Sequence, residues 1–314
     1  MEGQVAFPAQ LRRKLGRPPP ALLALALVGA VATVSTAAIL IRFSSAPPLS
    51  LAFHRLAIAT LVLLPFAWWI GVPRPSRRDA ALLAGVGGAL ALHFAAWIAS
   101  LRLTTVASSV VLVTFHPILV AAVAHGWGDR LRAAGWAGIG LALVGAFALV
   151  LSDSATFGAA GPHLVGNALA FAGAVFAAAF LLAGRRLRQR MGLLAYAVPM
   201  YGCASLVLLL LALAAGEPLS GFAAEDYAIF AALALGPQIA GHTVLNWSLR
   251  HVPAPLVSTA IVGEPIGSTL LAFWLLHETP AALAIAGAAL ILAGVALVAR
   301  GQTGALKAAG DVAP

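Results

Sequence analysis

Apolar residues form long runs along almost the whole chain, and short polar segments separate these runs. An α-helix needs about 20 consecutive apolar residues to cross a lipid bilayer, and the runs are about that long. We therefore predict ten transmembrane helices, at residues 21–41, 49–70, 79–101, 104–123, 133–151, 164–183, 193–215, 226–249, 254–276 and 280–299. Proline or glycine marks several of the boundaries. The pattern predicts an all-α integral membrane protein.

Two segments of the chain, 148 to 149 positions apart, resemble each other. The first covers residues 100–129 and the second covers residues 248–278, and both begin with Ser-Leu-Arg. His116-Pro117 in the first segment aligns with Glu264-Pro265 in the second. Each copy therefore holds a proline that breaks an apolar helix beside a titratable side chain. In membrane transporters such broken helices indicate a substrate path between two halves of the protein.

This repeat divides the membrane region into two halves, residues 21–151 and 164–300, with an N-terminal segment 1–20 and a tail 301–314. Each half has five predicted spans. Because five is an odd number, the second half enters the membrane from the opposite side. The fold that we predict is therefore two inverted five-helix repeats, an architecture that suits alternating access.

Glycines also occupy equivalent positions in the two halves, since Gly138 and Gly145 align with Gly287 and Gly294. Small residues let membrane helices approach closely. We expect the glycine runs to be close-packing surfaces: Gly85, Gly87 and Gly88; Gly135, Gly138 and Gly140; Gly287 and Gly294.

The composition agrees with a membrane protein, with 61% hydrophobic and only 9% charged residues and a mean hydropathy of +0.98. The net charge of +9 could suggest a nucleic-acid partner, but the basic residues lie in short loops and form no patch with interleaved aromatics. With both termini in the cytoplasm, sixteen of the 19 basic residues fall on the cytoplasmic side. This asymmetry follows the positive-inside rule and fixes the predicted orientation.

Three further features are the first apolar stretch, the single cysteine and the C-terminal tail. The apolar stretch 21–41 is too long for a signal-peptide core and is predicted to be the first span. A single cysteine, Cys203, excludes an internal disulfide or a cysteine-based metal cluster, and packing is its expected role. The tail after Arg300 is rich in alanine and glycine, and we expect it to be disordered.

The paired proline segments carry a resemblance to a known family. Ten spans in two halves, Glu264-Pro265 and the closing Glu278 resemble the EamA type of the drug/metabolite transporter superfamily, over about residues 18–300. The first half departs from that pattern, with His116 before its proline and Asp129 where glutamate is commoner. The resemblance implies a transporter rather than an enzyme, in a bacterial inner membrane. The chain as a whole, without a diagnostic motif, also resembles exporters of aromatic and other neutral amino acids.

Glu264 is the leading candidate for a functional side chain, because it lies about eleven residues into the ninth predicted span. A charged group at that depth is costly and needs a purpose. It would serve as a coupling-proton site or as an anchor for a substrate amine. The alternative is that its carboxylate accepts hydrogen bonds from backbone groups freed by Pro265.

Other polar and aromatic side chains could complete a central pocket with Glu264. Histidines occur inside three predicted spans, and a neutral imidazole serves by default in hydrogen bonds between helices. Trp97 and Trp247 lie in the third helices of the two halves. A position at the membrane–water interface or in helix packing explains them at least as well as stacking on a ligand. The predicted substrate-binding residues are His93, Trp97, Phe115, His116, Gln238, His242, Asn246, Trp247 and Glu264, with helix breaks at Pro117 and Pro265. No spacing predicts a metal site, and no cofactor is expected.

Arg55 lies near the outer third of the second predicted span. A long arginine side chain there could extend along the helix to place its charge at the membrane surface. We expect structural anchoring of this kind, with an ion pair between helices as the alternative.

The function predicted from the sequence is a secondary transporter, most simply an exporter of neutral or aromatic amino acids that works as a monomer in the lipid bilayer. The alternatives are transport of a drug, transport of a nucleotide sugar, or a channel. A nucleotide sugar carries two phosphates and would require several cations in the cavity, whereas only Arg55 is available. An enzyme is not predicted, because no nucleophile, acid/base pair or metal cluster has a suitable spacing.

Overall fold

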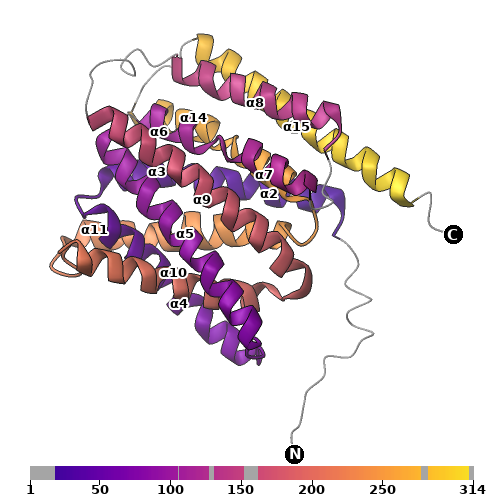
Figure 1. The fold of residues 1–314 in the computed structure, drawn as a ribbon. Helices are drawn as coiled ribbons and strands as arrows, with labels where there is room; N and C mark the ends of the chain where they lie inside the picture. Colours follow the sequence, from indigo (N-terminus) through magenta and orange to yellow (C-terminus); the bar gives the residue numbers. More distant parts are fainter. Residues whose placement is uncertain (1–17, 105, 127–130, 152–161, 277–281, 311–314) are drawn as a thin grey trace, which may run out of the picture.

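The computed structural model describes residues 18–104, 106–126, 131–151, 162–276 and 282–310, and these residues form helices without any strand (Figure 1). Six helical stretches are long and apolar enough to cross a membrane, and shorter apolar helices lie at His116–Gly126, Ala133–Ala148 and Ile285–Val298. The helices are α2 (Pro20–Val34), α3 (Ala37–Phe43), α4 (Pro48–Trp69), α5 (Arg77–Leu103), α6 (Val106–Val113), α7 (His116–Gly126), α8 (Ala133–Leu151), α9 (Pro162–Arg190), α10 (Leu193–Ala214), α11 (Ala224–Leu233), η2 (Ala234–Thr243), α12 (Val244–Ser248), α13 (Ala254–Ile261), α14 (Glu264–Leu276) and α15 (Ala282–Gly310).

The helix breaks predicted at the two repeated prolines are present. The helix is interrupted at Thr114-Phe115, between α6 and α7, and at Val262-Gly263, between α13 and α14. Each proline is the second residue of the helix that follows, Pro117 in α7 and Pro265 in α14. Proline has no backbone N–H and its ring displaces the carbonyl four residues earlier, so the helix is interrupted in the preceding turn.

Some local structure differs from the sequence-based expectation. The first apolar stretch is interrupted at Ser35-Thr36, between α2 and α3, although no proline lies there. Residues 234–243 form a π-helix with Pro237 inside it. Such wide turns adapt a helix where a normal backbone hydrogen bond cannot form, and Pro237 removes one donor from the ladder.

Two helices are longer than expected. The sixth apolar run continues as α9 to Arg190, so Arg185, Arg186 and Arg188 lie on a helix and not in a loop. The residues after Arg300 are helical as far as Gly310, so our expectation of a disordered tail is wrong for that segment. Asp129, Glu278 and Trp127 lie outside the described residues.

Helices α8 and α15 lie side by side along one edge of the bundle (Figure 1). An ideal Cβ at Gly138 would lie 2.7 Å from the Gly294 carbonyl oxygen, and one at Gly145 would lie 2.5 Å from the Gly287 carbonyl oxygen. The glycines at equivalent positions in the two halves thus lie at the contact between α8 and α15. The expectation of close packing holds at these positions, whereas Cβ atoms at Gly85, Gly88 and Gly140 would meet nothing within 4 Å.

The surface of the bundle carries large apolar side chains, as expected for helices in contact with lipid. Trp68 and Trp69 are each 86% exposed, and Trp274 is 75% exposed, near the ends of α4 and α14. Tryptophan is common at this level, where the membrane meets water. The opposite face of α4 packs into a core that also includes residues of α2, α3, α5 to α7 and α9 to α13.

Candidate functional site

A cavity lies between helices of both halves of the chain. It contains about 600 Å³ of space not occupied by atoms, counting the part that is open to solvent. Its wall is mostly apolar, with a few polar side chains, which is the usual character of a small-molecule site. The lining residues are Val34, Ala37, His93, Trp97, Val113, Thr114, His116, Ala177, Phe180, Leu181, His242, Leu245, Ile261 and Glu264.

Glu264 begins α14, directly after the helix break, and is 8% exposed. This break lies against the interruption between α2 and α3, because Ser35 Oγ donates a hydrogen bond to the Glu264 carbonyl (3.0 Å) and Ser268 Oγ donates to the Ser35 carbonyl (3.0 Å). A Cβ at Gly267 would collide with the Ser35 side chain, so glycine permits this approach. Among the described residues no hydrogen bond engages the Glu264 carboxylate. Within the described structure, a ligand or a proton could therefore bind this carboxylate without displacing a hydrogen bond.

His116 begins α7 and takes the position that Glu264 takes in α14. Its Nδ1 donates to the Val113 carbonyl at 2.8 Å. Val113 is four residues before Pro117, so the imidazole occupies the acceptor that the missing proline N–H leaves unpaired. Its Nε2 is buried without a hydrogen-bond partner of normal geometry in the described part of the chain, with the Ser258 backbone nearby. His116 thus has a structural role through one nitrogen and reaches the cavity wall with the same ring.

An aromatic wall on α5 faces the same cavity. The rings of His93 and Trp97 are stacked at 6.2 Å with an interplanar angle of 7°, and His93 Nδ1 donates to the Gly173 carbonyl on α9 at 2.9 Å. Trp97 is 4% exposed, so it does not belong to an interfacial belt. Its Nε1 is buried and has no partner among the described residues. His242, on η2, completes this side of the cavity.

Four of the predicted binding residues do not line the cavity. Phe115 packs against the cluster formed by α8, Val262 and α15. Trp247 lies beside His251, with ring centroids 4.7 Å apart. Gln238 and Asn246 are buried behind the wall, in contact with Arg55 and Tyr201 respectively.

Arg55 is the main residue that the sequence-based site omitted. Its side chain is 0% exposed, so it does not extend to the membrane surface as expected. Arg55 Nε donates to Gln238 Oε1 at 2.8 Å, and the guanidinium carbon lies 4.1 Å from the centroid of the Phe94 ring. A signal was present in the sequence, because an arginine within a span usually faces the interior of the bundle or a cavity. The structure assigns it to the interior because a partner, Gln238, lies there.

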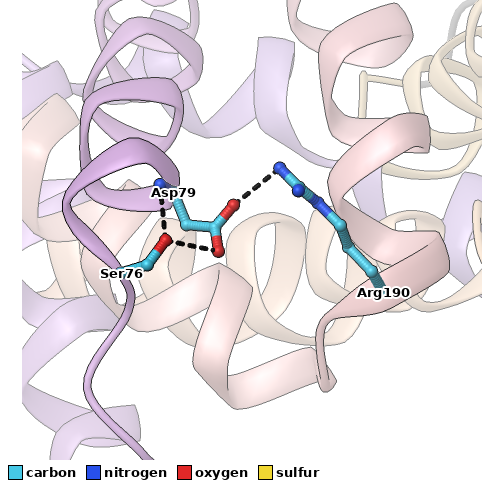
Figure 2. Close-up of polar contacts among 3 residues, drawn as sticks. All are labelled: Ser76, Asp79 and Arg190. Carbon is cyan, nitrogen blue, oxygen red and sulfur yellow. Dashed lines mark hydrogen bonds and ion pairs between the residues drawn. The ribbon is translucent and has the colours of Figure 1, made fainter.

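Polar contacts join the two halves at both ends of the bundle. At one end, Ser76 Oγ caps α5 by accepting from the Asp79 N–H (3.1 Å), and Asp79 pairs with Arg190, at the end of α9, at 2.6 Å (Figure 2). At the other end, the Asp226 carboxylate accepts three hydrogen bonds from the loop between α3 and α4. The donors are Ser44 Oγ (2.6 Å), the Ser45 N–H (2.9 Å) and Ser45 Oγ (2.6 Å).

No group of three or more His, Cys, Asp or Glu residues in the described segments is arranged to hold a metal ion. The cavity presents a mostly apolar and aromatic wall with a few polar side chains, among them the carboxylate of Glu264. Such a wall can bind an organic solute through hydrogen bonds, charge and apolar contact.

The sequence comparisons place this arrangement in a family. Residues 20–151 and 164–300 each match the profile described as the EamA-like transporter family. The chain belongs to the EamA-like transporter family. It is therefore a multi-pass membrane protein that transports small solutes, and it is not an enzyme.

Comparisons of structure agree on the fold of this EamA-like transporter. A solved structure described as "Crystal structure of protein" is similar to it with a TM-score of 0.74 and 24% sequence identity, over 88% of this chain and 96% of that chain. No curated protein matches the chain. These comparisons do not narrow the solute to the amino acids suggested by the sequence.

Proposed function

We propose that this EamA-like transporter moves a neutral, amphipathic amino acid through the cavity by alternating access. The observation that carries the proposal is Glu264, whose carboxylate lies at a helix break in an otherwise mainly apolar wall. An amine can bind this carboxylate, and an apolar or aromatic side chain fits the rest of the wall. No lysine or arginine lines the described part of the cavity, which disfavours a nucleotide sugar with its two phosphates.

The arrangement of the helices supports ten spans in two inverted halves. Under the repeat, α5 corresponds to the stretch from α11 to α12, and α9 corresponds to the stretch from α2 to α3. The packing follows this exchange, since α5 packs on α9 while η2 and α12 pack on α2. Helices α8 and α15 correspond to each other and pack together. Their glycines pair crosswise, Gly138 with Gly294 and Gly145 with Gly287, as a two-fold relation requires.

Two of the acidic contacts between the halves, those of Asp79 and Asp226, support alternating access. Asp79 and Asp226 are 147 positions apart, each at the start of a third helix of its half, and each contacts a helix corner of the other half. With the termini in the cytoplasm of a bacterial inner membrane, the Asp226 contact closes the outer end and the Asp79 contact closes the inner end. Thr104 donates to Asn167 at the outer end as well, at 2.9 Å. Opening either end requires that its contact break.

Uptake into vesicles tests the proposed substrate. Purified protein in liposomes should take up labelled neutral amino acids with saturable kinetics, and excess unlabelled amino acid inside should accelerate uptake by counterflow. The protein-free liposome is the control. Lack of saturable uptake for every neutral amino acid would contradict the substrate class, and linear uptake without counterflow would favour a channel. A second panel with an imposed pH gradient reports whether protons are coupled.

Removing the outer contact should favour an outward-open state. Asp226→Ala removes three hydrogen bonds to a charged group, and such bonds contribute about 1.5–3 kcal/mol each. The reporter is a cysteine in the cavity wall, Ala37→Cys, in a Cys203→Ser background. We expect it to react at least about tenfold faster with a membrane-impermeant thiol reagent added outside, since the loss of a single such bond already corresponds to about that factor. Asp79→Ala should speed labelling from the inside, by a smaller factor, because the side chains of its pair are 49% and 23% exposed.

The matched control for these variants is Glu225→Gln, which changes an exposed acid next to Asp226. It should leave both labelling rates unchanged. If both Asp226→Ala and Asp79→Ala accelerated labelling from the same side, the two contacts would not close opposite ends of the cavity.

A further inference from the structure

The guanidinium of Arg55 is completely buried but only partly hydrogen-bonded. Its Nε bonds to Gln238, while Nη1 and Nη2 are both buried with no partner among the described residues. Donors of a charged group left unpaired within a membrane protein are costly. A structural arginine would be expected to have its terminal nitrogens paired with a carboxylate or with backbone carbonyls.

A third unpaired donor lies next to this guanidinium. Because Arg55 Nε can only donate, the Gln238 amide must present its oxygen to it, and this contact assigns the amide orientation. The Gln238 Nε2 group is therefore the remaining donor; it is buried beside the Tyr201 hydroxyl and makes no hydrogen bond of normal geometry in the described structure. Arg55 and Gln238 thus offer three donor nitrogens without a well-formed partner, and charged N–H donors of this kind bind oxyanions such as a carboxylate.

This donor group lies one side chain behind the cavity wall. The Phe94 ring contacts the Arg55 guanidinium and also the ring of His242, at a centroid distance of 5.4 Å. His242 lines the cavity, as does His93, which precedes Phe94 on α5. A change in the Phe94 side chain or a small movement of α5 would therefore connect Arg55 with the cavity.

Arg55 and Glu264 interact electrostatically, yet no ion pair joins them in the described structure. A zwitterionic solute could bind between them, with its carboxylate at Arg55 and its amine at Glu264. We propose that Arg55, together with Gln238, binds the carboxylate of the transported solute, and that Phe94 covers this site in the conformation described here. The pairing of the solute amine with Glu264 rests on the proposed function, whereas the carboxylate site does not.

The test compares ligands that differ only in the group at issue. Binding of phenylalanine, phenylalaninamide, phenethylamine and 3-phenylpropanoate is measured on the purified full-length protein. The unmodified protein should bind phenylalanine about 10 to 100 times more tightly than phenylalaninamide, the range expected for hydrogen bonds to a charged group. In Arg55→Met this ratio should fall to about three or less. Arg55→Lys should lie between them, because it keeps the charge and loses the planar fork.

Arg78→Gln is the control for loss of a positive charge, since Arg78 is exposed at the start of α5. It should leave the ratio unchanged. If Arg55→Met does not fold, Gln238→Leu serves as the second variant, and loss of its donor should lower the ratio about fivefold.

The outcomes separate this inference from the proposed function. A ratio near one in the unmodified protein, or an unchanged ratio in Arg55→Met, would overturn the carboxylate site. Equal weakening of phenylalanine and phenylalaninamide would also overturn it, because a merely structural role affects both ligands alike. Binding of 3-phenylpropanoate but not of phenylalanine, with the Arg55 dependence retained, would support the site and overturn the amino-acid substrate. No binding of any of the four would overturn both.

Discussion

Glu264→Gln is expected to lower the initial rate of substrate uptake at least tenfold. Glutamine has nearly the same shape, so the helix break between α13 and α14 and the bond from Ser35 to the Glu264 carbonyl should persist. The change removes a negative charge from the cavity wall. A charge-assisted hydrogen bond contributes roughly 1.5–3 kcal/mol, which corresponds to a rate or affinity change of about 10- to 100-fold. Vesicle uptake at several substrate concentrations gives the rate.

The same measurement, repeated with an imposed pH gradient, distinguishes the two roles of Glu264. If the carboxylate carries the coupled proton, the gradient accelerates the unmodified protein and has no effect on Glu264→Gln. If the carboxylate only binds the substrate amine, the variant loses affinity and neither protein responds to the gradient. Glu225→Gln is the control, since it removes an exposed carboxylate on α11. An unchanged rate and pH profile in Glu264→Gln would contradict both roles.

Gly145→Leu is expected to prevent α8 and α15 from packing, and Gly145→Ala to destabilise the protein. A Cβ at this position would lie 2.5 Å from the Gly287 carbonyl oxygen and 2.8 Å from the Ile291 nitrogen. Both are backbone atoms of α15, so the clash cannot be relieved by a side-chain rotation and the helices must separate. Overpacking typically costs about 1–3 kcal/mol. Heating in detergent followed by size-exclusion chromatography should show a lower midpoint for Gly145→Ala and a poor yield for Gly145→Leu.

Gly140 offers a matched control five residues away on the same helix. A Cβ there would meet nothing within 4 Å. Gly140→Ala should therefore be neutral or slightly stabilising, since alanine is favoured over glycine within a helix by about 0.5–1 kcal/mol. Equal midpoints for Gly140→Ala and Gly145→Ala would show that the close approach of α8 and α15 does not limit stability.

Several of the helices could be located from the sequence to within a few residues. The run predicted at 193–215 is α10 (Leu193–Ala214), and the run predicted at 133–151 is α8 (Ala133–Leu151). The breaks before Pro117 and Pro265 were also predictable, because each proline lacks a backbone donor and follows a titratable side chain in both copies of the repeat. Proline alone is not sufficient, since Pro65 and Pro199 lie inside the unbroken helices α4 and α10. The break at Ser35-Thr36 was not predictable, because no proline causes it. Hydrogen bonds between Ser35 and α14 accompany it instead.

The candidate site was predictable only in part. His93, Trp97, His116, His242 and Glu264 line one cavity, as a reading of polar residues within apolar spans would suggest. Phe115 does not line this cavity, because it lies in the break before α7 and packs toward α8 and α15. No periodicity in the sequence was strong enough to predict that direction.

The sequence alone determined the class of this protein, the placement of its apolar helices and the internal repeat, because these depend on local composition and spacing. The paired prolines and the glycines at equivalent positions of the repeat can be seen in the sequence without any structure. The tertiary structure alone decided which side chains meet. It buries Arg55 against Gln238 and Phe94, and it places Gly145 against the backbone of α15. Such contacts depend on how each helix is rotated and crossed, and apolar faces that meet lipid and apolar faces that meet protein look alike in the sequence.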